Sequence, residues 1–391
     1  MTAFAESAPS TAATSRTSVD AGIPWMLYPI LASSAAIAVG LIWDISWHRT
    51  IGRDTFWSPP HVLEQLAAIV SGFVCGWVVL RTTFARSPDE RAASVKFWGF
   101  RGPLGAWVCI WATLMMISSA PFDNWWHNAY GLDVKIISPP HMILAAGMVG
   151  IQLGAMLLAA AAQNRATDAT AQRKLGYLYS ISAGIILTMV ATLIMEDGSM
   201  ANQMRGSTLY RLTAMVFPMV LVAAARGSGL KWSATIAALV YMAIQLVMIW
   251  TLQLFPATPM LAPIYNPVTH MVPPPFPLLV VVPAVAIDLL LSRWKRNDWL
   301  LVPIIGIAFV ALMLAAHWYW SAFMISPAAR NYVFAADQWD YNVRLGPWRY
   351  QYWAPESGMT LLKGLSIAAL YATISASIGL LWGRGMARVR R

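Results

Sequence analysis

The sequence predicts an all-α, polytopic integral membrane protein. The 391-residue chain is 58% hydrophobic and only 11% charged, whereas a soluble domain carries roughly 25% charged residues. A helix that spans a bilayer needs about 20 mostly apolar residues, and about ten runs meet that requirement. These runs are 24–46, 60–80, 103–122, 139–161, 175–195, 208–225, 232–255, 276–292, 299–322 and 360–383.

The first 23 residues differ in composition from the rest of the chain. Residues 1–23 are rich in Ser, Thr and Ala and contain a single basic residue, Arg16. The apolar run that follows is too long for the core of a signal peptide. We therefore expect a disordered cytoplasmic tail at 1–23, a first helical region at 24–161 and a C-terminal helical membrane region at 162–391.

The distribution of basic residues predicts the orientation in the membrane. Lys and Arg concentrate in the cytoplasmic loops of membrane proteins. With ten spans, most of the 27 basic residues fall on the side of the N-terminus, in 81–101, 165–174, 226–231, 293–296 and 384–391. Both termini are then cytoplasmic, in what we expect to be a bacterial inner membrane. The net charge of +10 is explained by this bias, and no nucleic-acid partner is expected.

One sequence motif, which we call the phrase, occurs twice in the first helical region and contains four of the six histidines. An aspartate and a histidine at the end of one span precede a polar loop, and Ser-Pro-Pro-His opens the next span. The two copies are Asp44-x3-His48-x12-His61 and Asp123-x3-His127-x13-His141. The sequence therefore predicts an internal repeat of two helical hairpins. The basic segment 81–102 joins them on the cytoplasmic side, so both copies have the same orientation.

The repeated phrase has the spacing of a metal site. Asp44 and His48 are four residues apart and share one face of a helix. Serine favours the N-cap position and proline the first turn of a helix, which places His61 in the first turn of the second helix. There the helix dipole disfavours a protonated imidazole, so the ring stays in the form that binds metal. The sequence predicts two such sites, each with one carboxylate and two histidines, at the outer ends of the helices.

Other interpretations of the phrase remain open. Imidazole suits copper, zinc, iron and nickel, and this ligand set also describes non-haem iron oxygenases and catalytic zinc. The same residues could be interfacial polar groups at helix ends. Haem is disfavoured because Pro59-Pro60 and Pro139-Pro140 interrupt any continuous helix between the paired histidines.

Further polar residues are candidates for supporting roles. Glu64 lies three residues after His61 on the same helix face and could be a ligand, a partner that fixes His61, or a proton relay. Leu144 takes its place in the second copy. Other candidates, which could also be salt-bridge or helix-end groups, are Asp54, Asp133, Glu196, Asp197, His270 and His317.

Two outer loops are expected in the C-terminal region. The loop at 256–275 is rich in proline and contains His270, which could approach the sites. The loop at 324–359 is rich in Trp and Tyr, which concentrate at membrane interfaces. We expect the second loop to lie on the membrane surface or against a partner, and His317 to be an interfacial hydrogen-bonding group.

The stretch from Asp44 to His61, including Arg53-Asp54 and the proline before the last histidine, resembles the metal motif in the C subunit of particulate methane and ammonia monooxygenases. That copper membrane monooxygenase family carries an Asp-x3-His-x12-His copper site and a neighbouring Asn-x3-His-x13-His site. Here Asp123 stands in the place of that Asn. The resemblance covers about residues 40–145.

The resemblance implies copper at the first site and a second metal at the other, with iron or zinc as alternatives. It also implies activation of dioxygen, hydroxylation of a small apolar molecule or ammonia, an electron donor such as a quinol, and partner membrane subunits in a hetero-oligomer. The family carries helices before the first motif, whereas here the motif ends the first span.

A non-catalytic metal-binding or structural subunit and an ion- or proton-coupled transporter are the alternatives. A transporter is expected to show repeats throughout the chain, whereas this repeat is confined to one third of it.

Overall fold

The prediction of an all-α membrane protein is confirmed by the computed structural model, which describes residues 23–391 except 85–87, 132–137 and 196–198. Nine helices of the described chain are long and apolar enough to cross a membrane. The helices are α1 (Leu27–Thr50), α2 (Pro59–Phe84), α3 (Pro88–Ala92), α4 (Leu104–Tyr130), α5 (Pro139–Arg165), α6 (Ala169–Met195), α7 (Thr208–Gly227), α8 (Ser233–Leu252), α9 (Val281–Arg293), α10 (Asp298–Met324) and α11 (Gly358–Met386). The short elements are strands β1 (Val95–Phe97) and β2 (Phe100–Gly102), which pair antiparallel, and the 3₁₀ turns η1 (Ala201–Gln203), η2 (Pro327–Ala329) and η3 (Pro347–Tyr350).

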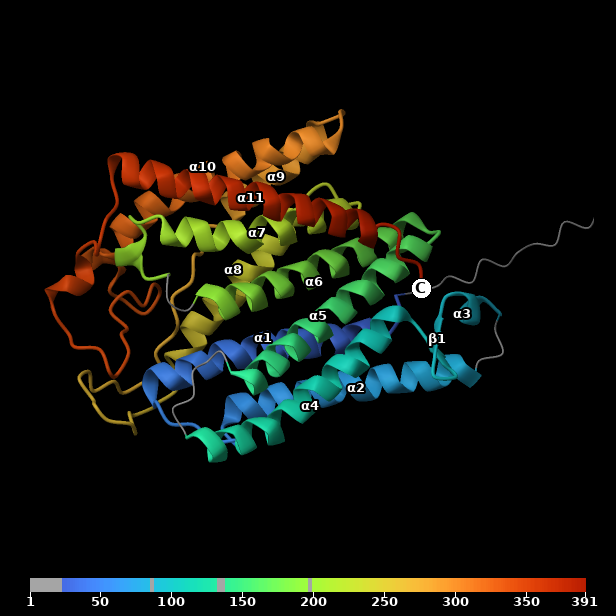
Figure 1. Cartoon of the computed structure of the whole chain (residues 1–391), viewed down its shortest axis with the longest axis horizontal. Coiled ribbons are helices and arrows are strands. Elements are labelled where there is room, and N and C mark those ends of the chain that lie inside the picture. The colour runs from blue at the N-terminus through green and yellow to red at the C-terminus, as the bar shows by residue number, and fades with distance from the viewer. Residues whose placement is uncertain (1–22, 85–87, 132–137, 196–198) are drawn as a thin grey trace, which may run out of the picture.

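The run expected to form a tenth span, 276–292, differs from the prediction. Only a 13-residue helix, α9, forms there, and the buried segment 271–280 before it is not helical. Four prolines in that segment, Pro273–Pro275 and Pro277, have no backbone N–H to donate to a helix. The segment and α9 together still return the chain to the end of the bundle where the C-terminus lies (Figure 1).

The two predicted hairpins, α1–α2 and α4–α5, are present and pack side by side. Helix α2 contacts α4, and α1 contacts α5. Both hairpins turn at the same end of the bundle (Figure 1). We call this the loop end; it carries residues 51–58 and the two long segments 253–270 and 325–357. The division into three regions stays a prediction, and residues 1–22 of the expected tail lie outside the described residues.

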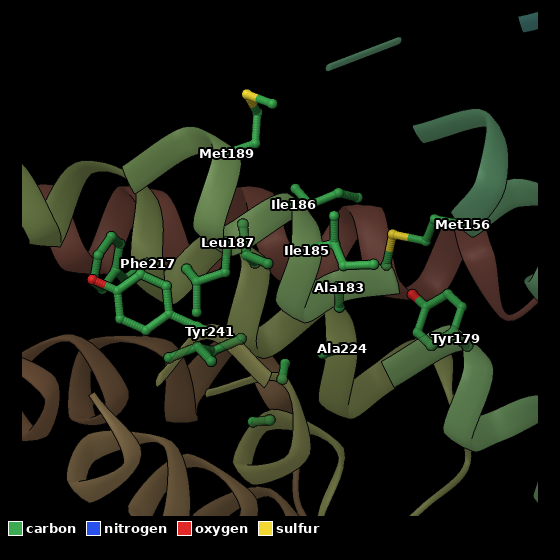
Figure 2. Packing of buried hydrophobic residues seen from close by; sticks show 14 of the residues in the cluster. Met156, Tyr179, Ala183, Ile185, Ile186, Leu187, Met189, Phe217, Ala224 and Tyr241 are labelled. Atoms are coloured by element: carbon green, nitrogen blue, oxygen red, sulfur yellow. The ribbon is translucent and has the colours of Figure 1, made fainter. Parts of the chain in front are cut away.

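Helix α6 lies at the centre of the core. Figure 2 shows its residues Tyr179 and Ala183 with Met156 from α5, Phe217 from α7 and Tyr241 from α8. The buried tyrosine hydroxyls are paired, since Tyr179 donates to the Ala223 carbonyl at 3.1 Å and Tyr241 donates to the Pro277 carbonyl at 3.0 Å. These two hydroxyls are therefore satisfied by backbone carbonyls of neighbouring segments within a largely apolar core.

Helices α4 and α5 approach each other through glycine. Small residues allow close backbone contact, which drives association where lipid removes the usual hydrophobic force. A Cβ on Gly154 would lie 2.7 Å from the Gly105 carbonyl oxygen and 3.1 Å from the Cys109 nitrogen. The second metal phrase is carried by these two helices, so this contact also fixes its geometry.

We expect Gly154→Ala to destabilise the protein by about 1–3 kcal/mol, because the added methyl group meets backbone atoms that cannot move aside. Gly76→Ala in α2 is the matched control, since no atom lies within 4 Å of its Cβ position. That change should be neutral or stabilising by up to about 1 kcal/mol, because alanine is the better helix former. Thermal unfolding in detergent, followed by helical circular dichroism, compares the two. Equal midpoints would contradict the proposed close contact.

The loop at 324–359 was expected at the membrane surface or against a partner, and in the structure the two long loops contact each other and the end of α1. The N–H of Tyr265 donates to the Tyr341 carbonyl at 2.9 Å, and the Asn266 side chain donates to the Trp339 carbonyl at 2.7 Å. The N–H of Tyr341 in turn donates to the Arg49 carbonyl at 3.1 Å. The loops therefore brace the turn of α1 that carries His48.

Candidate metal centres

The first phrase forms a cluster between α1 and α2. Asp44 and His48 lie one turn apart on α1, and His61 lies in the first turn of α2, as predicted. The His61 Nε2 atom is 3.1 Å from Asp44 Oδ1, and the His48 Nε2 atom is 3.8 Å from Asp44 Oδ2. One carboxylate thus faces both imidazoles. We call this group, with Asp54, site 1.

Asp54 joins the same cluster from the connection 51–58. Its Oδ2 atom lies 3.5 Å from His61 Nε2 and 3.6 Å from His48 Nε2. The indole Nε1 of Trp47 donates to the Arg53 carbonyl at 2.9 Å, which holds the connection over the site. Ligand atoms of Asp44, Asp54 and His61 all lie within 4.8 Å of one another. The sequence left open whether Asp54 binds metal or pairs with Arg53, and the structure places its carboxylate among the histidines.

A backbone hydrogen bond orients His61. Its Nδ1–H donates to the Thr55 carbonyl at 2.9 Å. Because a carbonyl only accepts, the Nδ1 atom carries a proton, and Nε2 is the ring nitrogen that faces the carboxylates. Histidine ligands of metals are commonly fixed in this way.

The predicted serine caps differ from the structure. The Ser58 hydroxyl accepts the Thr55 N–H at 2.8 Å instead of an N–H of α2. Ser138 is the N-cap residue of α5, but its side chain makes no capping hydrogen bond. Prolines at the first two positions of each helix remove one of the two N–H groups that an N-cap serine usually accepts from, which weakens the preference for a cap.

The second phrase forms a matching cluster between α4 and α5, which we call site 2. The His127 Nε2 atom is 3.3 Å from Asp123 Oδ2, and the His141 Nε2 atom is 3.4 Å from Asp123 Oδ1. The His127 Nδ1 atom lies 3.3 Å from the Gly131 carbonyl, so this ring is also oriented by the backbone. Ligand atoms of the three residues lie within 4.8 Å of one another. The candidates Asp133, Glu196 and Asp197, and the lysine Lys135, lie outside the described residues.

Both aspartates leave one buried oxygen unsatisfied. The Oδ1 atoms of Asp44 and Asp123 are buried and have no hydrogen-bond partner within the described ranges, although a histidine Nε2 lies close to each. A buried polar atom without a partner is costly. Two donors about 2.0–2.2 Å from one ion at a tetrahedral angle lie roughly 3.4 Å apart. The observed separations fit donors that share a cation.

The sites are partly open to solvent. The side chain of His48 is 45% exposed, whereas that of Asp44 is 18% exposed. At site 2 the side chains of His127 and Asp123 are 25% and 31% exposed. Each site therefore has an inner wall of protein and one side that a small molecule can reach.

Glu64 lies beside site 1 in the α1–α2 interface. Its side chain is buried and packs against Gly40, where a Cβ would lie only 2.6 Å from Glu64 Cγ. Gly40 precedes Asp44 by one helical turn, and Glu64 follows His61 by one turn. The Oε1 atom has no hydrogen-bond partner in the described chain. Glu64 is therefore placed next to the ligand cluster without belonging to it.

The remaining two histidines belong to neither described cluster. His270 is exposed and bonds within its own loop, with Nδ1 3.0 Å from the Thr269 hydroxyl. His317 was expected at the interface, and that prediction is wrong: the side chain is fully buried in α10. Its Nδ1 bonds the Met313 carbonyl of its own helix at 3.1 Å, whereas its buried Nε2 has no hydrogen-bond partner in the described chain.

A glycine allows the connection of site 1 to fold. Gly52 has a φ of +81°, and a Cβ there would collide with the Tyr341 phenol. Burial, followed by the charge of Asp340, raises the pKa of Tyr341 above its ordinary value, so the phenol stays neutral at physiological pH. We expect Gly52→Ala to lower the free energy of unfolding by about 1–3 kcal/mol more than Gly99→Ala does. Both changes strain the backbone similarly, but only Gly52→Ala adds a steric clash.

The control Gly99 has a φ of +86° and no atom within 4 Å of its Cβ position. Thermal unfolding measures the difference between the two variants. We also expect Gly52→Ala to lose metal from site 1, because Asp54 follows Gly52 by two residues. Metal content measures this second effect. If Gly99→Ala were equally destabilised and equally poor in metal, the role of the Tyr341 contact would be refuted.

The fold and these two clusters define the protein as a polytopic helical membrane protein with two possible Asp/His metal-binding groups at one end of its bundle. No family model matches the chain, and neither a curated protein nor a solved structure matches it.

Proposed function

We propose that the protein is the metal-binding membrane subunit of a copper-dependent monooxygenase that hydroxylates a small apolar molecule or ammonia. One observation carries the metal-binding part: in both copies of the phrase, one carboxylate faces two histidine Nε2 atoms and keeps a buried oxygen without a described partner. The oxygenase part is supported by the resemblance over residues 40–145.

The donor set supports copper as the metal. Imidazole nitrogen suits copper, and copper binds most tightly among the divalent first-row metals at such sites. Site 2 offers three donors within the described chain, so a bound ion keeps a position for a small molecule. Bound copper would supply the redox chemistry that activates dioxygen, and the protein would orient the ion and limit access to it. Iron and zinc are the alternatives that the same donors allow.

A second candidate function is a non-catalytic role in binding or handling metal. Asp54 is the observation that favours it, because a fourth donor brings site 1 closer to the closed set typical of structural metal sites. The two functions could also be divided between the sites, with site 1 structural and site 2 open.

The proposal includes an orientation and partners. The basic segments 81–101 and 384–391 would face the cytoplasm, and both metal sites would face the outer side of a bacterial inner membrane. Other membrane subunits would complete a hetero-oligomer and deliver electrons from a donor.

Turnover in native membranes tests the proposal. Membranes with wild-type protein should convert ammonia or a short alkane with ¹⁸O₂ into labelled product, lose this activity with a copper chelator, and regain it with added copper. His61→Ala and His141→Ala should each reduce product formation, whereas His270→Ala, an exposed histidine outside both clusters, should not. Copper retained at both sites without any labelled product would favour the non-catalytic function instead.

A further inference from the structure

A cavity lies at the loop end, apart from the metal-ligand clusters. It is bounded by the ends of α1, α8 and α10 and by residues 199–204 and 333–339, and its volume is about 80 Å³. Its walls are mostly apolar and partly aromatic. They include Ile249, Pro274, Phe276, Trp320, Met324 and Phe334. Such a lining suits the hydrocarbon part of a small ligand.

A few polar groups in the wall lack partners. Asn202 in η1 is 2% exposed, and both its Nδ2 and Oδ1 atoms are without a hydrogen bond in the described parts of the chain. The Trp339 Nε1 and the Arg49 Nε are also buried and unpaired there. All three side chains line the cavity. A buried amide that satisfies neither its donor nor its acceptor is rare in folded proteins, because each unmade bond costs free energy.

Two arginines, Arg49 and Arg349, line the cavity, and the Arg349 Nε donates to the Gly346 carbonyl at 3.2 Å. Arg49 forms an ion pair with Asp340, with Arg49 Nη2 2.5 Å from Asp340 Oδ1. The unpaired polar atoms of the wall are two donors, Trp339 Nε1 and Arg49 Nε, and the donor and acceptor of the Asn202 amide. A hydroxyl group satisfies Asn202 completely, since it donates to Oδ1 and accepts from Nδ2. An ionised carboxylate could only accept, so it would leave the Asn202 Oδ1 atom without a donor.

We propose that this cavity binds a small, neutral, mostly apolar alcohol, with Asn202 recognising the hydroxyl group and Trp339 donating to its oxygen. The hydrocarbon part packs against the aromatic and proline wall. The proposal does not depend on metal at either site, because none of the metal ligands lines the cavity.

Photolabelling of the full chain in detergent with a diazirine derivative of octanol tests this site. Labelled peptides should come from residues 199–204, 320–325 and 333–339, and octanol should compete whereas octane should not. Asn202→Leu should weaken competition by octanol about tenfold, the effect of roughly 1.4 kcal/mol. Gln351→Leu, a similar polar-to-apolar change at an exposed position of the same end, should bind like wild type.

Two controls separate binding from folding and from the metal. Asn202→Leu should keep or raise the unfolding midpoint without ligand, because it removes an amide that makes no described hydrogen bond. Chelated protein should label like untreated protein. Competition by octane equal to that of octanol, unchanged labelling of Asn202→Leu, or a lowered midpoint for that variant would each overturn the proposal.

Discussion

Asp44→Ala will remove the metal from site 1 and leave site 2 occupied, and Asp123→Ala will do the reverse. Each aspartate is the group that faces both histidines of its cluster, so its loss removes one ligand and the charge that attracts the cation. Removing a residue that only supports a metal ligand weakens metal binding about 10–100-fold. Because the aspartate is itself a ligand, its removal should weaken binding by more than about 100-fold.

Metal content per chain after dialysis against a weak chelator measures this effect. Asp337→Ala is the matched control, because Asp337 is exposed at the same end of the bundle and belongs to neither cluster. Loss of both metals in either single variant would show that the clusters do not bind independently. Retention of both metals in both variants would show that the aspartates are not ligands.

Asp340→Asn will destabilise the fold by about 3 kcal/mol, because it leaves the buried Arg49 guanidinium without its counter-charge. The Arg49 side chain is 8% exposed. The pair links the loop 325–357 to the turn of α1 that carries His48, so we also expect weaker metal binding at site 1. The double variant Arg49→Met/Asp340→Asn should be more stable than Asp340→Asn, since it removes the unpaired charge.

Unfolding midpoints of the single and double variants in detergent test this pair. A double variant no more stable than Asp340→Asn would mean that the buried charge is not the source of the loss. A single variant with the wild-type midpoint would mean that the pair contributes nothing to the fold, despite its burial.

Local patterns were sufficient to predict the ligand clusters. Asp44 and His48 share a helix face because of their spacing, and Pro59-Pro60 starts the next helix just before His61. The hairpin then returns His61 to the level of its partners. The same local rules apply to the second copy, where Asp123, His127 and His141 form one group. At site 1 the group within 4.8 Å is Asp44, Asp54 and His61, and the predicted ligand His48 lies outside it.

Features that depend on distant segments were not predictable from the sequence. The place of Asp54 in site 1 depends on how residues 51–58 fold back, which the Trp47 hydrogen bond to Arg53 and the Gly52 contact with Tyr341 determine. The helix predicted at 276–292 was too long, since α9 begins only at Val281, because hydropathy does not register the missing N–H of Pro277. The cavity around Asn202 combines segments from distant parts of the chain, and no sequence pattern marks it.

Elemental analysis of the natively purified protein, beside a His48→Ala/His127→Ala double variant, tests directly whether the two clusters are metal centres. We expect close to two copper ions per chain in the wild type, one for each cluster, and a loss of both in the double variant with the fold retained by circular dichroism. Protein purified gently without chelator that contains no metal, or a double variant that keeps the wild-type metal content, would contradict the claim that these clusters are metal centres.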